Sequence, residues 1–485
     1  MVPTYGDHPD HWNTKPPLLI WQMAALMRLG FPVILAARLP VLLAAFLTVG
    51  VVWGICRYVL RDRLAAVISG ALLVSSLRFT GVHGARTADY DVPLTLLILC
   101  YSFAFWVSIE RRTTIRIRWF AICAGGVVLA VMTKGIAGAF ALPGLFIFSL
   151  VTGRFPALMR SREAWVLTLL TLGLCLGYYG TRELYDPGYL KAVWEGELVS
   201  FPFVLEGHSE ALGFYLWVLL KGFEPGMILL PLVGVTLAAP EPRRRSIMLL
   251  CLCCAGAVLT VVTAAQTKLN WYATPALPFL AIAAALGVTN GLRWIEARDS
   301  RLPCVIRRNP LQIGLFILLG IAITACFYRN QVLIPRQLQD ASAGQFWYGR
   351  PPGQFWYGRL FAALQASGNV DRVIVLDRGM QTLSGEKYYN PMLKLYAQLA
   401  REYGLTVTVT NSLAPIPAGQ LVATCDPDWV PVLEHQDRFK VVGKIPLCVW
   451  GLKAAGERET EAIRGQTKIG QQQGHGTGLL QASEP

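Results

Sequence analysis

The sequence predicts a polytopic α-helical membrane protein that ends in a small water-soluble α/β domain. Hydrophobic residues make up 54% of the 485 residues and charged residues 15%, a balance that leaves a soluble globule short of polar surface. The basic residues give a net charge of +14, but they form short clusters between apolar runs and do not share one polar face. This pattern indicates a membrane protein and argues against nucleic-acid binding.

Apolar runs of roughly 20 residues, long enough to cross a bilayer as helices, recur before residue 330. We expect about ten spans, near 33–56, 64–83, 91–109, 118–133, 136–152, 164–180, 213–238, 246–265, 272–293 and 311–328. Arginine clusters follow every second span, beginning with Arg57, Arg61 and Arg63. The positive-inside rule then predicts a multi-pass plasma-membrane protein with both ends, the active face and the C-terminal domain outside the cytoplasm.

Beyond residue 330 the pattern changes to short strands, expected at 370–376, 405–410, 421–424, 439–442 and 449–452, with a helix at 391–403. We divide the chain into a membrane domain (1–330), a juxtamembrane linker (331–369), an extracytoplasmic α/β domain (370–456) and a disordered tail (457–485). The linker holds two copies of GQFWYGR, which we interpret as a local duplication without functional weight. Cys425 and Cys448 are the only cysteines of the α/β domain and could form a disulfide, a pairing that the sequence leaves open.

Charged side chains at membrane depth are costly and usually face a cavity or a partner, so they are the candidates for a site. The outer segments contain seven of them: Lys15, Arg86, Asp89, Asp91, Lys134, His208 and Lys268. Tyr272, at the end of the outer segment 266–272, is grouped with these residues. The competing interpretations are a snorkelling anchor for Lys134 alone and an Arg86–Asp91 ion pair that only holds a loop.

The chemistry of these residue types suits transfer from a phosphorylated donor. Lys15, Arg86 and Lys268 together can neutralise a phosphate, and a carboxylate such as Asp89 or Asp91 can accept the proton of a hydroxyl. Because the outer compartment lacks nucleotide sugars, a glycosyl transfer there requires a donor carried on a lipid phosphate. No His or carboxylate spacing demands a metal, so we expect no cofactor, although a divalent metal stays open.

Several motifs resemble those of the bacterial family 39 glycosyltransferases. They are NTKPPLLIW at 13–21, ARLP at 37–40, ARTADYDVPL at 85–94, TKGIAG at 133–138 and KLNWYATPALP at 268–278, joined by the outer-loop sequence YDPGYLKAVWEGEL at 185–198. Their order and spacing fit that family over about residues 5–330.

The resemblance implies a GT-C fold, a polyprenyl-phosphate sugar donor, and an acceptor that is lipid A, another glycolipid or a protein hydroxyl. That family includes the aminoarabinose transferases of lipid A and is related to the protein O-mannosyltransferases. Residue by residue, it makes Lys15 and Lys268 contacts of the donor phosphate and Arg86 and Asp91 site residues. It puts His208 on the outer rim, with Asp89 a less certain member.

This sequence departs from the family at its beginning. Members start with a first transmembrane helix and an outer loop that carries an Asp-Glu pair, whose Asp is the expected base. Here the sequence starts just before KPPL, so we expect either a start upstream of Met1 or a truncated chain, and favour the former. Two further hypotheses stay open: a non-catalytic remnant of the family, and a transporter of a lipid-linked substrate, for which no internal repeat was found.

Overall fold

The computed structural model describes residues 3–5, 8–11, 13–81, 83–110, 114–198, 210–221, 241–299, a few residues between 320 and 332, 353–368, 370–378, 390–413, 416–426, 428–435, 439–445 and 448–453. The chain divides into two compact units, residues 1–337 and 338–485.

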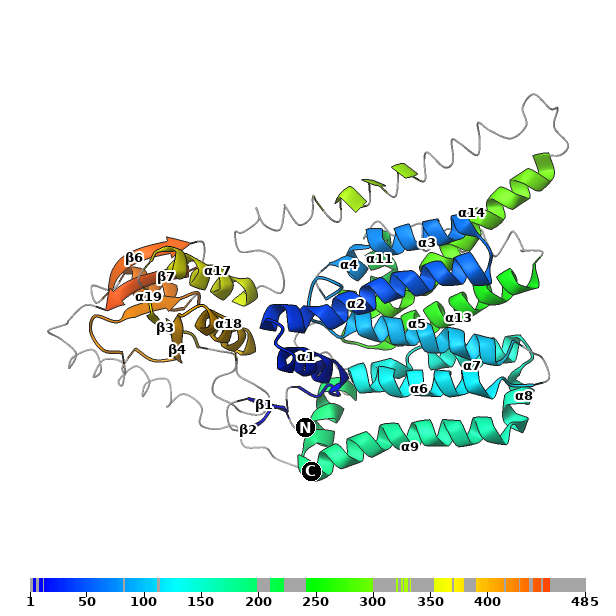
Figure 1. Cartoon of the computed structure of the whole chain (residues 1–485), viewed down its shortest axis with the longest axis horizontal. Coiled ribbons are helices and arrows are strands. Elements are labelled where there is room, and N and C mark those ends of the chain that lie inside the picture. Colours follow the sequence, from blue (N-terminus) through cyan, green and yellow to red (C-terminus); the bar gives the residue numbers. More distant parts are fainter. Residues whose placement is uncertain are drawn as a thin grey trace, which may run out of the picture. The chain divides into compact units, whose positions relative to one another are not determined.

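The first unit is a bundle of helices (Figure 1). Its α-helices are α1 (Leu18–Arg28), α2 (Val33–Gly54), α3 (Arg63–Ser75), α4 (Leu77–Thr80), α5 (Asp91–Ser108), α6 (Ile117–Lys134), α7 (Leu142–Val151), α8 (Phe155–Arg160), α9 (Arg162–Tyr185), α10 (Tyr189–Val193), α11 (Phe214–Lys221), α13 (Pro242–Ala264) and α14 (Leu277–Asp299). Short π- and 3-10 helices join some of them: η1 (Ile55–Val59), η2 (Gly135–Ala139), η3 (Trp194–Leu198) and η4 (Asn270–Ala276). Strands β1 (Thr4–Tyr5) and β2 (His8–Pro9) form a small antiparallel ribbon.

Six helices of the described residues are long and apolar enough to cross a membrane, and they cover six of the predicted spans: 33–59, 91–108, 117–139, 162–185, 242–264 and 270–293. Such helices satisfy their backbone hydrogen bonds internally, as a bilayer requires. α5 and α14 are almost wholly buried in the bundle, whereas α9 exposes nearly all its apolar side chains. The exposed side chains of α9 form the surface expected to face lipid.

Two predicted spans are interrupted. The span expected at 64–83 breaks at Ser76, whose backbone is extended, so that α3 ends there and α4 begins anew. The span expected at 136–152 begins only with α7 at Leu142, because Gly135 has a φ of +60° and the next residues form a 3-10 turn. The spans expected at 213–238 and 311–328 lie largely outside the described residues.

A buried ion cluster lies between the end of α2 and the start of α3 and joins three helices. The side chain of Asp62 caps α3 by accepting the N–H of Ala65 at 2.9 Å. It also accepts a hydrogen bond from Arg244 of α13 at 2.7 Å, and the fully buried Arg244 reaches Asn290 and Thr289 of α14. The cluster ties α3, α13 and α14 together at this end of the bundle, which is the end opposite to the start of α5.

The second unit is built on a mixed five-stranded sheet of order β4-β3-β5-β7-β6. Its elements are α17 (Gly353–Ala366), β3 (Arg372–Leu376), α18 (Pro391–Glu402), β4 (Thr406–Thr410), β5 (Leu421–Thr424), α19 (Val430–His435), β6 (Phe439–Ile445) and β7 (Cys448–Lys453). β3 pairs in parallel with β4 and β5, while β7 runs antiparallel to β5 and β6. The predicted fold class, a helical membrane unit followed by an α/β unit, is confirmed.

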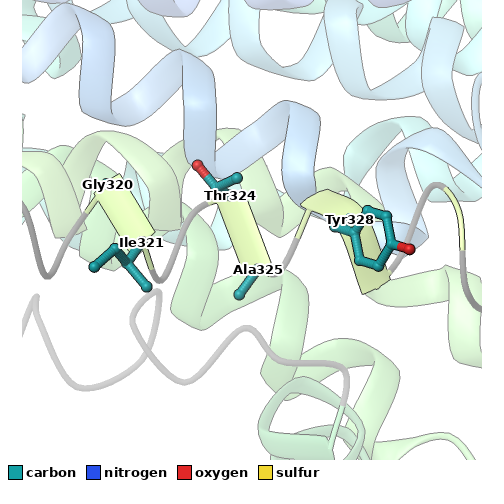
Figure 2. Close-up of a pocket in the computed structure, with 5 residues that line it drawn as sticks. All are labelled: Gly320, Ile321, Thr324, Ala325 and Tyr328. Atoms are coloured by element: carbon teal, nitrogen blue, oxygen red, sulfur yellow. The ribbon is translucent and has the colours of Figure 1, made fainter.

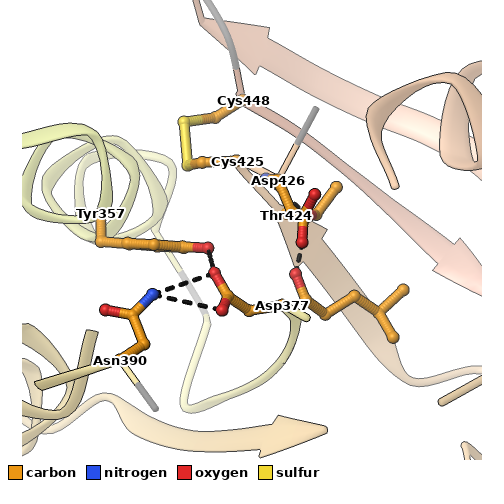
Figure 3. The surroundings of a disulfide bond; sticks show 8 residues. Tyr357, Asp377, Asn390, Thr424, Cys425, Asp426 and Cys448 are labelled. Carbon is orange, nitrogen blue, oxygen red and sulfur yellow. Dashed lines mark hydrogen bonds between the residues drawn. A yellow bond between two sulfur atoms is a disulfide. The ribbon is translucent and has the colours of Figure 1, made fainter. Parts of the chain in front are cut away.

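Polar contacts fasten this sheet to its helices, and a disulfide joins two of its strands (Figure 3). Asn390 caps α18 through the N–H of Leu393 and donates to both carboxylate oxygens of the buried Asp377 at 3.2 Å. The hydroxyl of Tyr357 donates to the same carboxylate. Cys425 and Cys448 are joined by a disulfide between the ends of β5 and β7, the pairing that the sequence left open.

The second copy of GQFWYGR, in the segment interpreted as a juxtamembrane linker, lies in α17. Tyr357 of this copy is 2% exposed and packs with Leu360 and Phe361 into the core of the second unit. The periodic aromatic and leucine side chains explain why this segment forms a helix that packs on the domain. The first copy, at 344–350, and the tail expected at 457–485 lie outside the described residues.

Candidate functional site

Asp91 and Lys134 form a buried ion pair between two antiparallel helices. Asp91 is the first residue of α5 and Lys134 the last of α6, so the connection of the helices brings both to one end of the bundle, at the left in Figure 1. The Nζ of Lys134 lies 2.6 and 2.7 Å from the two carboxylate oxygens of Asp91, and Asp91 is 1% exposed. Each charge also complements the dipole of its own helix end. The Arg86–Asp91 pair considered from the sequence is not the pair that forms.

Asp89 lies in the loop that enters α5. Its carboxylate accepts hydrogen bonds from the N–H of Tyr90 at 2.7 Å and interacts with the ring nitrogen of His83. Burial opposes ionisation of Asp89, but the contact with His83 and the charge of Lys134 outweigh it and keep the pKa below its ordinary value. Asp89 is therefore a carboxylate at neutral pH. Arg86, in the same loop, is exposed.

The segment before α14 packs against this loop. The ring of His83 stacks on Trp271 with centroids 3.7 Å apart. Tyr272, the next residue, presents its ring 5.2 Å from Lys134 Nζ, a distance at which the cation and the ring attract each other. The Tyr215 hydroxyl fixes the backbone of this segment by donating to the carbonyl of Leu269 and accepting its N–H, at 3.1 and 3.2 Å.

Lys268 begins this segment and is only 4% exposed. Among the residues that the structure describes, no hydrogen bond or ion pair engages its ammonium group. Burying a cation without a partner is costly, and buried charges are normally paired. Lys268 is thus a buried positive charge that no described residue is seen to balance.

Lys15 belongs to a second lysine–carboxylate pair, with Glu197 of η3. Its Nζ lies 2.9 Å from Glu197 Oε1, and the hydroxyl of Thr14 donates to the same oxygen at 2.8 Å. The Tyr189 hydroxyl donates to the carbonyl of Thr14 at 2.8 Å and holds the segment against α10. Glu197 Oε2 also lies beside Gly135, the residue that follows Lys134, so the two lysine–carboxylate pairs are neighbours.

The structure brings together most of the predicted site residues. Lys134 pairs with Asp91 and lies near the ring of Tyr272, and Asp89 lies two residues before Asp91 in the loop that enters α5. Lys268 stands four residues before Tyr272 in the segment that packs against this loop. Lys15 contacts Glu197, a residue that the sequence did not point to. The predicted His208 lies outside the described residues.

His83, Trp271 and Glu197 were missed. A signal existed for two of them, since Trp271 lies inside the motif KLNWYATPALP and Glu197 inside YDPGYLKAVWEGEL. In the described part of the chain no group of three or more His, Cys, Asp or Glu side chains is arranged to hold a metal ion.

A surface pocket elsewhere in the first unit has a different character (Figure 2). Its walls come from Gly320, Ile321, Thr324, Ala325 and Tyr328 and are almost entirely apolar. None of the predicted charged residues lines it. We assign no polar chemistry to this pocket.

The segment that holds Lys15, Asp89, Asp91 and Lys134 matches a known protein family. Residues 14–179 match the family model of the dolichyl-phosphate-mannose-protein mannosyltransferases. This mannosyltransferase match confirms the resemblance predicted from the motifs. Lys268, Tyr272 and Glu197 lie beyond the matched segment. No curated protein matches the sequence.

Two solved structures have the same fold over nearly the whole chain. The crystal structure of ArnT from Cupriavidus metallidurans bound to undecaprenyl phosphate has a TM-score of 0.61 and 17% identity, covering 94% of this chain and 90% of that one. The apo structure of the same protein has a TM-score of 0.58 and 16% identity, covering 92% and 89%. The mannosyltransferase-like segment therefore sits in a chain with an ArnT-like architecture.

Proposed function

We propose that this protein transfers a sugar from a polyprenyl-phosphate donor to a hydroxyl-bearing acceptor on the extracytoplasmic side of the membrane. The observation that carries the proposal is the proximity of two lysine–carboxylate pairs, Lys15–Glu197 and Lys134–Asp91, at one end of the helix bundle, where Glu197 lies beside the residue that follows Lys134. The side chains of Glu197, Lys134 and Asp91 are 10% exposed or less. Burying charged groups is costly, and a site for a charged lipid substrate explains why they are buried here.

The lysines are the proposed phosphate contacts. Lys15 is 31% exposed at its side chain and can exchange its carboxylate partner for a phosphate, while Lys268 is buried without a partner among the described residues. Arg86, exposed on the neighbouring loop, adds a bidentate donor for phosphate oxygens. The undecaprenyl phosphate bound to the structurally similar ArnT supports a polyprenyl phosphate as the anion.

The reaction is proposed to invert the configuration at the anomeric carbon of the sugar. The acceptor oxygen attacks the anomeric carbon while its proton passes to an ionised carboxylate of the site. The bond from that carbon to the phosphate oxygen breaks, and its electron pair leaves with the polyprenyl phosphate. Fixed positive charge near the departing phosphate stabilises the transition state more than the ground state. Asp91 acts in this scheme by holding Lys134 in place, and Asp89 supplies a second ionised carboxylate.

The test is release of polyprenyl phosphate from a polyprenyl-phosphate sugar by the purified full-length chain in lipid, with acceptor lipids and acceptor peptides supplied in parallel. Transfer predicts acceptor-dependent release together with a labelled acceptor. Donor binding without release, for every acceptor, would favour the non-catalytic remnant. Movement of intact donor across the bilayer without release would favour the transporter.

A further inference from the structure

A groove lies between α6 and α9 at the end of the bundle opposite to the proposed site, where both helices begin (Figure 1). The two helices pack against each other, and α9 leaves nearly all its apolar side chains exposed. The groove has a volume of about 470 Å³, and its apolar wall is formed by Ile117, Ala121, Val166 and Leu167. An exposed apolar groove on a membrane-spanning surface is suited to hold a lipid chain.

Two arginines line the same groove, one from each helix. Arg118 is the second residue of α6 and Arg162 the first residue of α9, and both side chains are exposed. Arg118 forms no hydrogen bond or ion pair with any residue that the structure describes. Each arginine adds positive charge to a helix start, where the helix dipole already disfavours a cation and favours an anion.

A single carboxylate, that of Glu163, is found among the residues that line the groove. It accepts a hydrogen bond from the hydroxyl of Ser161 at 2.9 Å. Two arginines and one glutamate leave one positive charge over, so the groove combines an apolar wall with a surplus of positive charge at its helix starts. This combination is complementary to a lipid whose headgroup is anionic.

Two tryptophans stand beside these arginines and indicate the depth of the groove in the membrane. Trp119 follows Arg118 directly and is 43% exposed, and Trp165 of α9 is 46% exposed. The indole N–H of Trp165 donates to the carbonyl of Met159 at 3.2 Å. Tryptophan is enriched where lipid headgroups meet the hydrocarbon. The arginines are therefore expected at headgroup level, with the apolar wall at the level of the chains.

We propose that this groove binds one anionic phospholipid, with an acyl chain on the apolar wall and the phosphate held by Arg118 and Arg162. Basic pockets between transmembrane helices recognise lipid headgroups in this way. The competing interpretation is that the two arginines only snorkel to the membrane surface and select no lipid. That interpretation requires no groove beneath the charges. The site is separate from the proposed transfer site, so the proposal does not depend on the transfer reaction.

The experiment titrates the purified full-length protein in detergent with phosphatidylglycerol or with phosphatidylcholine of the same chain length, and counts bound lipid by native mass spectrometry. We expect tighter binding of phosphatidylglycerol. Arg118→Gln and Arg162→Gln should each weaken it about fivefold, and the double variant about thirtyfold, the usual effect of basic residues near an anionic headgroup. Arg63→Gln is the matched control, because Arg63 is an exposed arginine that begins α3 and does not line the groove.

A second variant tests the apolar wall without touching the charges. Ala121 is exposed on the groove side of α6, so Ala121→Leu should be tolerated by the fold, occupy part of the groove and weaken phosphatidylglycerol binding while both arginines remain. Excess inorganic phosphate should not displace the lipid, because it lacks the chains that contact the wall. Complete displacement by phosphate would overturn the proposed lipid contact.

Three other results would overturn the proposal. Equal affinities for the two lipids would show that the groove does not recognise the anionic headgroup. Unchanged phosphatidylglycerol binding in the double arginine variant would show that the headgroup is held elsewhere. An equal loss in Arg63→Gln would show that the effect is one of general surface charge, as the snorkelling interpretation requires.

Discussion

Asp91 and Lys134 are 43 residues apart in the chain, yet their charged groups are in direct, two-point contact in the interior of the helix bundle. Asp91 begins α5 and Lys134 ends α6. Their contact therefore fixes where the two helices meet at the site.

Asp91→Asn should lower both stability and transfer. The substitution leaves the buried ammonium of Lys134 without its counter-charge, which costs about 3–5 kcal/mol. Adding Lys134→Met removes the orphaned charge and should restore most of the thermal stability but none of the transfer activity. Thermal unfolding and sugar transfer of the single and double variants separate the two effects. Normal transfer in Asp91→Asn would remove Asp91 from the site.

Lys15→Met and Lys268→Met should each weaken binding of undecaprenyl phosphate. A hydrogen bond to a charged group contributes about 1.5–3 kcal/mol, which corresponds to roughly a 10- to 150-fold loss of affinity. Titration of the purified variants with the lipid measures it. Lys191→Met is the control, since the Lys191 side chain is 77% exposed on α10. Equal affinities in all four proteins would contradict the assignment of the phosphate contacts.

Asp62→Asn should destabilise the opposite end of the bundle in a way that depends on pH. Asn retains the oxygen that caps α3 but loses the charge that pairs with Arg244, at a cost of up to about 3–5 kcal/mol. Burial opposes ionisation of Asp62, but the Ala65 N–H and the Arg244 guanidinium keep its pKa below the ordinary value. The contribution of Asp62 is therefore complete above the unfolded pKa of about 3.9 and is lost as the pH falls through the lower folded value.

The difference in unfolding temperature between wild type and Asp62→Asn should thus stay constant from about pH 5 to 8 and shrink below about pH 4. A difference that changes within the neutral range would show that another group is responsible. Arg243→Met, which removes an exposed pair with Glu110, should cost less than about 1 kcal/mol.

Removing the disulfide should loosen the second unit. Cys425 and Cys448 are 23 residues apart, and closing a loop of this length stabilises a fold by about 3 kcal/mol in the chain-entropy view. In the full-length chain, Cys425→Ser with Cys448→Ser should speed hydrogen exchange in β5 and β7 and leave α5 unchanged. Cys175→Ser, a substitution of an unpaired cysteine, is the control. Unchanged exchange in β5 and β7 would mean that the sheet is stable without the bond.

Much of the fold could be predicted because it depends on local pattern. The length and hydropathy of α2, α9 and α13 are sufficient to predict membrane spans, and the alternation of apolar residues in 370–453 was sufficient to predict the strands. The breaks at Ser76 and Gly135 were not predicted, since they depend on single backbone conformations inside apolar runs. α17 was missed because a repeated sequence was interpreted as a linker.

The sequence indicated candidate site residues, but not the contacts between them. Arg86 is five residues from Asp91 and was the obvious partner in the sequence, whereas packing of two distant helices selects Lys134. Glu195 and Glu197 look equivalent in the motif WEGEL, and only the π-helical turn η3 distinguishes the exposed acid from the buried one. Such choices are made by tertiary contacts, which a single sequence does not contain.

The Cys425–Cys448 bond also carries information about how the chain is inserted in its membrane. Thiols facing the cytosol are kept reduced, while disulfides form and persist on the oxidising side. A copy inserted with its second unit outside would carry a covalent bond between β5 and β7, and a copy inserted the other way would carry two free thiols. The oxidation state of Cys425 and Cys448 thus records the orientation of each molecule. Alkylation of free thiols in intact cells measures the fraction of molecules in which the two cysteines are reduced.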